Sequence, residues 1–281
     1  MLKAGPEAMT QEEYLLLNEF IAGDIGLAFP EHKRDLLESR LRPRLQALRL
    51  RRYIEYYFLL QADDGAERRS LAELVTNNET YFFRETQQFD ALFEHALPRL
   101  RAGAPEPARL RLLSAGCSSG EEAYTLAIAA RQHFVELAGT KLTIDAFDVD
   151  RGRIETARRG QFAGTSFRVT TPQQVARWFL PTGDGRWAVK PFLQAGLRFS
   201  TGNILDLETF AAPAPYDALF CRNVLIYFSE PALHRAVLNF ASVLRPGGLL
   251  FLGHSESIIG MSKRFETLRL GATIAYRKVG D

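Results

Sequence analysis

The sequence predicts an α/β protein in which a small all-α domain precedes a doubly wound parallel sheet. Short apolar runs that alternate with helix-like segments after residue 109 predict the sheet. A stretch of small residues, Ala115–Gly120, directly follows one of these strands and opens a helix, as is typical of a doubly wound fold. Before Val75 only helical patterns occur, and 281 residues are enough for two domains.

The composition is that of a globular protein, with 46% hydrophobic and 24% charged residues. A formal net charge of +2 gives no overall reason to expect nucleic acid or an anionic membrane as the partner. Cys117 and Cys221 lack the spacing of a metal site, so we expect reduced thiols in a reducing compartment. The N-terminus has no apolar signal core, and no run approaches the roughly 20 residues of a membrane span. We therefore expect a cytoplasmic protein without membrane insertion.

Four helices are expected in the N-terminal part. Thr10 and Glu13 have the spacing of a capping box, which marks the start of the first helix. In the second helix leucines recur at helical spacing, and Pro43 is expected to kink or split it. The expected helical ranges are 10–21, 35–50, 53–60 and 67–75.

The second of these helices has a basic face. Between Glu31 and Arg52, eight Lys or Arg residues stand against three acids. Such a charge run fits a solvated face, and it also fits a surface that docks an acidic partner. The docking interpretation centres on Arg40, Arg44 and Arg51.

Three consecutive aromatic residues stand among polar ones in the segment Asn77–Glu85. One interpretation is a helix start capped by Asn78 or Thr80 with packed phenylalanines; the other is a segment that contacts a ligand. Prolines and small residues at 101–108 predict a linker. We expect a helical domain at 1–100, the linker to about 108, and a second domain at 109–281.

The strand that begins at Leu110 leads into a glycine turn and a helix start. Gly116 and Gly120 let the backbone approach a ligand closely, and the positive helix end is exposed at the strand tip. Glu121 and Glu122 would repel a phosphate, so the ligand is expected to be cationic or rich in hydroxyls. S-adenosylmethionine meets both conditions, although the turn alone also fits an ordinary βα connection.

Asp148 ends the second strand, where doubly wound folds bind ribose hydroxyls. It follows Gly120 by 28 residues, more than the roughly 20 of a dinucleotide fingerprint, which requires a long first helix at 121–137. Residues 160–196 interrupt the alternation with a polar helix near 172–179 and a hairpin at Asp184–Gly185. The other expected elements are helices at 151–159 and 229–244 and strands at 142–147, 197–200, 218–221, 249–252, 265–270 and 273–277.

Six ordered motifs together resemble the CheR family of chemotaxis receptor methyltransferases, which transfer a methyl group from S-adenosylmethionine to glutamate side chains of chemoreceptors. The likeness extends to HKRDLLESRLRPRLQAL in the helical part and TPQQVARWF in the insertion, and so covers nearly the whole chain. The six motifs are NNETYFFRE, SAGCSSGEEAY, FDVD, GNILD, FCRNVLIYF and LGHSES.

This resemblance implies a Rossmann-like class I methyltransferase sheet of seven strands with a reversed last strand, and a small antiparallel β subdomain inserted at about 160–196. It implies chemoreceptor cytoplasmic domains as partners, a receptor tail peptide at the inserted subdomain, S-adenosylhomocysteine as the second product, and a monomer without nucleic acid or metal. Arg84 and Tyr227 are implied nearest the methyl-transfer centre. With Gly116 of the glycine turn, the expected cofactor contacts are Asn78, Thr80, Arg84, Glu122, Asp148, Asn203, Ile204, Arg222 and Asn223.

The chain departs from the family pattern at Asn77, Glu79 and 169–171, which bears on fine substrate contacts. A glutamate carboxylate is ionised at pH 7, since its reference pKa is about 4.3, so its methylation needs no general base. His254 is then as compatible with a structural hydrogen bond as with catalysis.

Two alternatives differ in class. Methylation of an amine on nucleic acid is typical of enzymes with an Asn/Asp-Pro-Pro-aromatic turn, whereas this chain has Arg222-Asn223-Val224-Leu225 there. A binding module would keep the fold as a cofactor-dependent sensor or adaptor without transfer. The intact acidic and arginine positions favour the enzyme.

Overall fold

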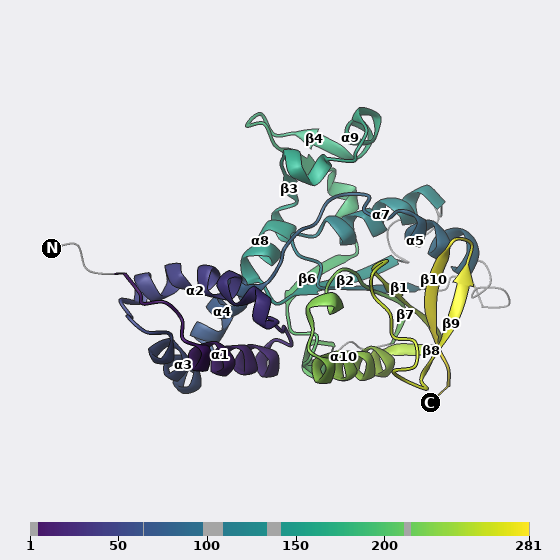
Figure 1. The fold of residues 1–281 in the computed structure, drawn as a ribbon. Coiled ribbons are helices and arrows are strands. Elements are labelled where there is room, and N and C mark those ends of the chain that lie inside the picture. The colour runs from purple at the N-terminus through teal and green to yellow at the C-terminus, as the bar shows by residue number, and fades with distance from the viewer. Residues whose placement is uncertain (1–4, 64, 98–108, 134–141, 211–214, 281) are drawn as a thin grey trace.

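A computed structural model of the chain describes residues 5–63, 65–97, 109–133, 142–210 and 215–280 (Figure 1). Its N-terminal part is all helical, as expected. The Thr10 hydroxyl accepts the Glu13 N–H at 3.2 Å and the Glu13 carboxylate accepts the Thr10 N–H at 2.9 Å, which confirms the capping box. The helices are α1 (Gln11–Asp24), α2 (Arg34–Leu48), α3 (Tyr53–Ala62) and α4 (Ala66–Val75).

Helix α2 runs through Pro43 as one element, so the expected split does not occur. Pro43 is exposed, and the hydrogen bond that its ring removes is therefore lost on the side where water can replace it. On the opposite side Leu37, Leu41 and Leu45 are fully buried in the core of the helical domain.

The second part is built on a seven-stranded sheet with the order β6-β2-β1-β7-β8-β10-β9. Pairing is parallel from β6 to β8, and β10 runs antiparallel to both of its neighbours, which confirms the reversed last strand. The strands are β1 (Leu110–Ala115), β2 (Leu142–Asp148), β6 (Leu197–Thr201), β7 (Tyr216–Cys221), β8 (Leu244–Leu252), β9 (Phe265–Leu270) and β10 (Thr273–Lys278).

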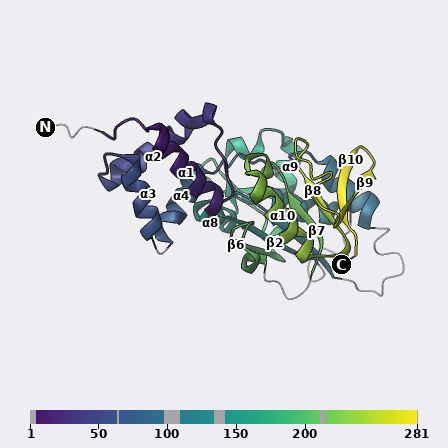
Figure 2. The same cartoon turned by 60° about the horizontal axis from the view of Figure 1, so that its bottom comes forward.

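Helices cover both faces of this sheet (Figures 1 and 2). Helix α7 (Glu121–His133) and the continuous α5 (Gln87–Asp90) and π-helix (Ala91–Ala96) pack on one face, and α10 (Glu230–Val243) packs on the other. Helix α8 (Arg151–Arg159) follows β2. The predicted end of the first long helix, 134–137, lies outside the described residues.

The predicted antiparallel insertion is present between α8 and β6 and projects from the sheet domain (Figure 1). Its strands have the order β3-β5-β4, and Thr171 caps α9 as part of a second capping box. The elements are β3 (Gln161–Phe162), α9 (Pro172–Trp178), β4 (Phe179–Pro181) and β5 (Trp187–Val189), with 3-10 turns at Gly164–Phe167 and Pro191–Leu193.

The core of the helical domain ends at Val75, whereas the buried residues from Phe82 to Leu97 belong to the core of the second domain. The expected boundary near residue 100 therefore lies C-terminal to side chains that pack with the sheet and the insertion rather than among α1–α4. The predicted linker at 101–108 lies outside the described residues. Within the described part, no helix combines the length and apolar character that a bilayer span requires.

Candidate functional site

A cavity lies at the carboxyl ends of the parallel strands, beside the helical domain. Its empty volume is about 920 Å³, open solvent at the mouth included. Every residue expected to bind the cofactor or to lie near the transfer centre lines it: Asn78, Thr80, Arg84, Gly116, Glu122, Asp148, Asn203, Ile204, Arg222, Asn223 and Tyr227.

The glycine turn brings the backbone against this cavity. Gly116 has φ +77°, and a Cβ there would lie 2.6 Å from Val224 Cγ2. Gly120 has φ +94°, and its Cβ would lie 2.8 Å from the Cβ of Ala157 on α8. Only glycine tolerates both the left-handed backbone and these close approaches. The turn therefore depends on the two residues that the sequence singled out.

Asp148 is 7% exposed at the end of β2. Its carboxylate accepts the backbone N–H of Ser118 at 2.7 Å and that of Asp150 at 2.9 Å, which ties the glycine turn to the strand end. Burial raises the pKa of Asp148 to about 6, although the backbone hydrogen bonds oppose the shift. Each carboxylate oxygen can accept a further hydrogen bond, so the group can still bind a diol.

Glu122, in the first turn of α7, forms a buried network with Arg222. Its two oxygens accept from Ser114 Oγ at 2.7 Å and from Arg222 at 3.1 Å. The Arg222 side chain is 2% exposed and also donates to Glu85 at 3.2 Å and to the carbonyl oxygen of Arg84 at 2.6 Å. Burial raises the pKa of Glu122, and Arg222 works against that shift. Two carboxylates thus share one buried guanidinium.

Glu85 extends this network to the surface. Burial alone would raise its pKa, but hydrogen bonds from His254 and Arg222 hold the pKa below its ordinary value. The His254 Nδ1 lies 2.8 Å from Glu85 Oε1. His254 therefore contacts the site through Glu85 rather than by lining the cavity, which fits the structural interpretation.

The aromatic segment forms a loop and does not start a helix at Asn78 or Thr80. Phe83 and Glu85 have positive φ, and the Phe82 ring is fully buried. Asn78 donates to Asp150 at 2.7 Å, so the loop is fastened directly to the end of β2. The arrangement favours the ligand-contact interpretation of this segment.

The transfer-centre residues lie on two different loops that meet at the cavity. Arg84 donates to the carbonyl oxygen of Glu79 at 3.1 Å, and its guanidinium lies 5.5 Å from the centroid of the Tyr81 ring. Tyr227 belongs to the 3-10 turn Leu225–Tyr227, and its hydroxyl lies 2.6 Å from the Asn77 amide nitrogen. Asn77, a departure from the family pattern, therefore contacts an expected transfer residue directly.

The helical domain supplies part of the wall, which no sequence signal indicated. Ile25 and Leu27 line the cavity, and Asn203 donates to the Asp24 carbonyl oxygen at 2.8 Å. The backbone N–H of Ala28 also donates to the carbonyl oxygen of Tyr227 at 2.8 Å. These bonds join residues far apart in the chain, so only the folded structure reveals them.

Arg44, one of the three docking candidates, is committed to its own domain. Its guanidinium forms two hydrogen bonds with Glu67, at 2.8 and 2.5 Å. Tyr56 donates to the same carboxylate at 2.9 Å. The pair therefore joins α2 to α4 around a buried tyrosine.

The other two candidates differ from Arg44 and from each other. Arg40 donates to the Val75 carbonyl oxygen, and its guanidinium lies 5.8 Å from the Phe29 ring centroid. Burial lowers the pKa of Arg40, and the Tyr227 hydroxyl opposes that shift. Arg40 also donates to the carbonyl oxygen of Thr76 at 3.4 Å, and Thr76 lines the cavity. Arg51 is exposed and pairs with the exposed Glu7 at 3.3 Å. Docking by these arginines stays a prediction.

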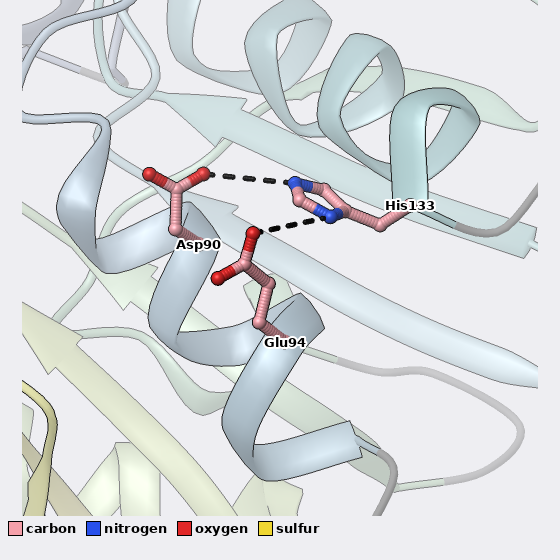
Figure 3. Close-up of side chains that lie close together, drawn as sticks. All are labelled: Asp90, Glu94 and His133. Atoms are coloured by element: carbon pink, nitrogen blue, oxygen red, sulfur yellow. Dashed lines mark ion pairs between the residues drawn. The ribbon is translucent and has the colours of Figure 1, made fainter.

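One group of potential metal ligands occurs among the described residues, away from the cavity (Figure 3). His133 lies between two carboxylates, with 3.6 Å from Nε2 to Asp90 and 3.7 Å from Nδ1 to Glu94. Both acids come from the continuous α5 and π-helix, and the imidazole stacks on Phe93. The two carboxylates approach different ring nitrogens. These ion pairs join α7 to the continuous α5 and π-helix. The expectation of no metal stays a prediction.

Comparisons with known proteins give a consistent result. The model described as "CheR methyltransferase, SAM binding domain" matches residues 78–274, and "CheR methyltransferase, all-alpha domain" matches residues 12–76. Chemotaxis protein methyltransferase of Klebsiella aerogenes is 36% identical, covering 92% of this chain and 87% of that protein. Chemotaxis protein methyltransferase 1 of Pseudomonas aeruginosa is 32% identical, covering 94% and 97%. Chemotaxis protein methyltransferase of Escherichia coli is 34% identical, covering 95% and 91%.

Proposed function

The chain belongs to the CheR methyltransferase family and is an S-adenosylmethionine-dependent methyltransferase of chemotaxis, and from this premise we propose that its product is a glutamate methyl ester on a chemoreceptor cytoplasmic domain. The observation that carries the proposal is the composition of the cavity. The buried Asp148 and the largely buried Glu122 line it together with Arg84 and Tyr227, and no histidine lines it among the described residues.

The residues present fit the cofactor. S-adenosylmethionine supplies an electrophilic methyl group on a sulfonium. Asp148 would accept from the ribose diol, and Glu122 would accept from the ammonium group of the amino-acid end. Asn223 Oδ1 is buried without a hydrogen-bond partner at the cavity wall, which leaves an acceptor for a donor of the adenine.

The chain's own residues have little proton chemistry to perform. An ionised glutamate brings its own lone pair, so the enzyme must orient the carboxylate and exclude water. Arg84 would hold the carboxylate, and the Tyr227 ring would face the cation, an attraction of roughly 0.5–2 kcal/mol. Positioning of this kind can lower a barrier by roughly 7–11 kcal/mol. Cys117, the one thiol in the cavity wall, has its pKa raised far above the ordinary value by burial and stays neutral.

The partner and its docking follow the same proposal. An acidic receptor helix bundle would lie across α2 at the cavity rim, with Arg51 exposed and Arg40 near Tyr227, and a receptor tail peptide would bind the inserted subdomain. The protein would work in the cytoplasm as a monomer and without a metal. Arg44 would support this surface indirectly, because its charge is paired with Glu67.

The product distinguishes the proposal from its alternatives. Methyl-labelled S-adenosylmethionine is incubated with the enzyme and a panel of receptor cytoplasmic fragments, and the labelled fragment is then treated with mild alkali. An ester releases volatile labelled methanol, whereas a methylamine keeps its label. Label that survives alkali would contradict carboxyl methylation. Cofactor binding without transfer to any fragment would favour the sensor or adaptor.

A further inference from the structure

The carboxylate of Glu256 gathers four backbone N–H groups, although the side chain does not line the cavity. Its Oε2 accepts from Gly253 at 2.6 Å and from Asn223 at 2.8 Å. Its Oε1 accepts from Val224 at 2.8 Å and from Ile226 at 3.2 Å. Glu256 and Gly253 follow β8, whereas Asn223, Val224 and Ile226 follow β7, so one side chain connects the ends of two adjacent strands.

The loop that Glu256 holds, Arg222–Tyr227, leaves several of its backbone N–H groups without a partner inside the loop. Asn223 has φ +60°, a left-handed conformation that is uncommon outside glycine. The 3-10 turn Leu225–Tyr227 begins next, and the first N–H groups of such a turn have no partner within it. An ionised carboxylate satisfies several of these donors at once with charge-assisted hydrogen bonds.

The same loop lines the cavity through Arg222, Asn223, Val224 and Tyr227. Val224 also packs against Gly116 of the glycine turn. A shift of the loop would therefore move the expected cofactor contacts and the expected transfer residue together.

We infer that Glu256 is the positioning residue of the loop Arg222–Tyr227, and that its carboxylate sets both cofactor affinity and the geometry of methyl transfer. The inference rests on the proposed function for the transfer step alone, since cofactor affinity can be measured without a receptor. Glu256 acts through the loop backbone and touches neither reactant.

Glu256→Gln tests this inference, because glutamine keeps the length but offers one acceptor oxygen and an NH2 group that faces the N–H donors. S-adenosylhomocysteine is titrated calorimetrically, and kcat and KM are measured with a receptor fragment. We expect a 10- to 100-fold rise in the Kd for S-adenosylhomocysteine, on the scale of lost charged hydrogen bonds. Glu256→Asp, which keeps the charge on a shorter stem, is expected to recover part of the affinity. Glu266→Gln is the matched control, since Glu266 is exposed on β9 and pairs with Arg277 at 2.6 Å.

Gly253→Ala perturbs the same contact while leaving Glu256 unchanged. A Cβ at Gly253 would lie 2.8 Å from Glu256 Oε2 and 2.9 Å from the Asn223 nitrogen. Both substitutions act on the same contact. The rise in the Kd for S-adenosylhomocysteine in the double variant should therefore be smaller than the product of the rises in the two single variants.

A purely structural role has a different signature. Partial unfolding lowers the calorimetric stoichiometry and kcat but leaves the Kd and the KM of the folded molecules unchanged. If Glu256→Gln does not fold, Gly253→Ala and Glu256→Asp carry the same measurement. If the variants that fold have the same Kd and KM for the cofactor as the wild type, the inference is overturned. A wild-type enzyme that methylates no receptor fragment would refute the proposed function, and the comparison of Kd values would still decide the role of Glu256.

Discussion

The carboxylates of the cavity and the arginines of α2 differ in how much of their hydrogen-bonding capacity the surrounding protein already uses. Asp148 and Glu122 are buried among donors yet keep acceptor capacity toward a cavity, and burial raises the pKa of both. Arg44 is bonded twice to Glu67, and Arg40 is bonded to backbone carbonyl oxygens. A buried charge whose partners are incomplete is suited to a ligand, whereas a charge that its own domain satisfies mainly holds that domain together.

Among the cavity carboxylates and the arginines of α2, loss of Asp148 should have the largest effect, and that effect should be on cofactor affinity. Asp148→Ala removes the expected ribose acceptor and also releases the N–H groups of Ser118 and Asp150. We expect the Kd for S-adenosylhomocysteine to rise on the order of 10- to 100-fold at pH 7.5, about 1.5–3 kcal/mol. Asp184→Ala, at the exposed hairpin of the insertion, is the control for calorimetry. Unchanged affinity would remove Asp148 from the cofactor site.

The pH dependence of binding tests the same carboxylate without a change in fold. The pKa of Asp148 is raised to about 6, so the group is ionised at pH 7 and protonates as the pH falls through 6. If the ionised form binds the diol, affinity for S-adenosylhomocysteine should fall roughly tenfold between pH 7 and pH 5. In the ligand-free protein the sign is opposite: because the folded-state pKa of about 6 exceeds the ordinary value of 3.8, the stability contribution of Asp148 is lost as the pH rises from about 4 to about 6 and stays constant above that. Asp148→Asn should show weak binding that is independent of pH over this range, and a pH profile like that of the wild type would contradict the assignment.

Arg44 should affect stability rather than cofactor binding. Arg44→Ala leaves Glu67 largely buried beside Tyr56 without its guanidinium. Because Arg44 is itself one-third exposed and water screens the pair, we expect a loss of about 1 kcal/mol in the free energy of unfolding. Urea denaturation measures it, and Arg51→Ala is the comparison. A stability loss no larger than that of Arg51→Ala would mean that Arg44 is as free as an exposed arginine.

Arg51 should give the smallest effect and the cleanest test of docking. Arg51→Glu is expected to slow receptor methylation about two- to fivefold at low salt, to lose that difference at high salt, and to leave cofactor affinity unchanged. Lys263→Glu reverses a charge elsewhere on the surface and serves as the control. Equal rates for both variants at low salt would support a merely solvated face. Charge reversal at Arg44 is unsuitable here, because it would place two carboxylates together.

Elements with a strong local signal could be predicted from the sequence. The capping box at Thr10 and the glycine turn at Gly116 and Gly120 depend on residues within a few positions of each other. The motifs then indicated which residues gather at the strand ends, and all of them line one cavity.

The remaining features depend on contacts between distant segments, which no short pattern encodes. Residues 82–97 leave the helical domain because their apolar partners lie on the sheet and the insertion. Glu256 stands 33 residues from Asn223, and Asn203 stands 179 residues from Asp24. The two helical-domain residues of the wall, Ile25 and Leu27, look like ordinary core positions in the sequence.

The burial of Phe82 makes the inserted subdomain and the aromatic loop one packing unit. The Phe82 ring lies 4.8 Å from Phe162, 5.3 Å from Phe167 and 4.7 Å from Phe179, measured between ring centroids. Its backbone N–H donates to the Ser166 carbonyl oxygen at 2.9 Å.

Such an arrangement limits how recognition can be transplanted between homologues. A chimera that exchanges only residues 160–196 would place foreign side chains around Phe82 and disturb the loop that carries Asn78 and Arg84. Exchange of residues 77–85 together with 160–196 would keep the aromatic contacts matched. Any change in the subdomain around Phe82 is therefore coupled, through one phenylalanine, to the loop that carries Asn78 and Arg84.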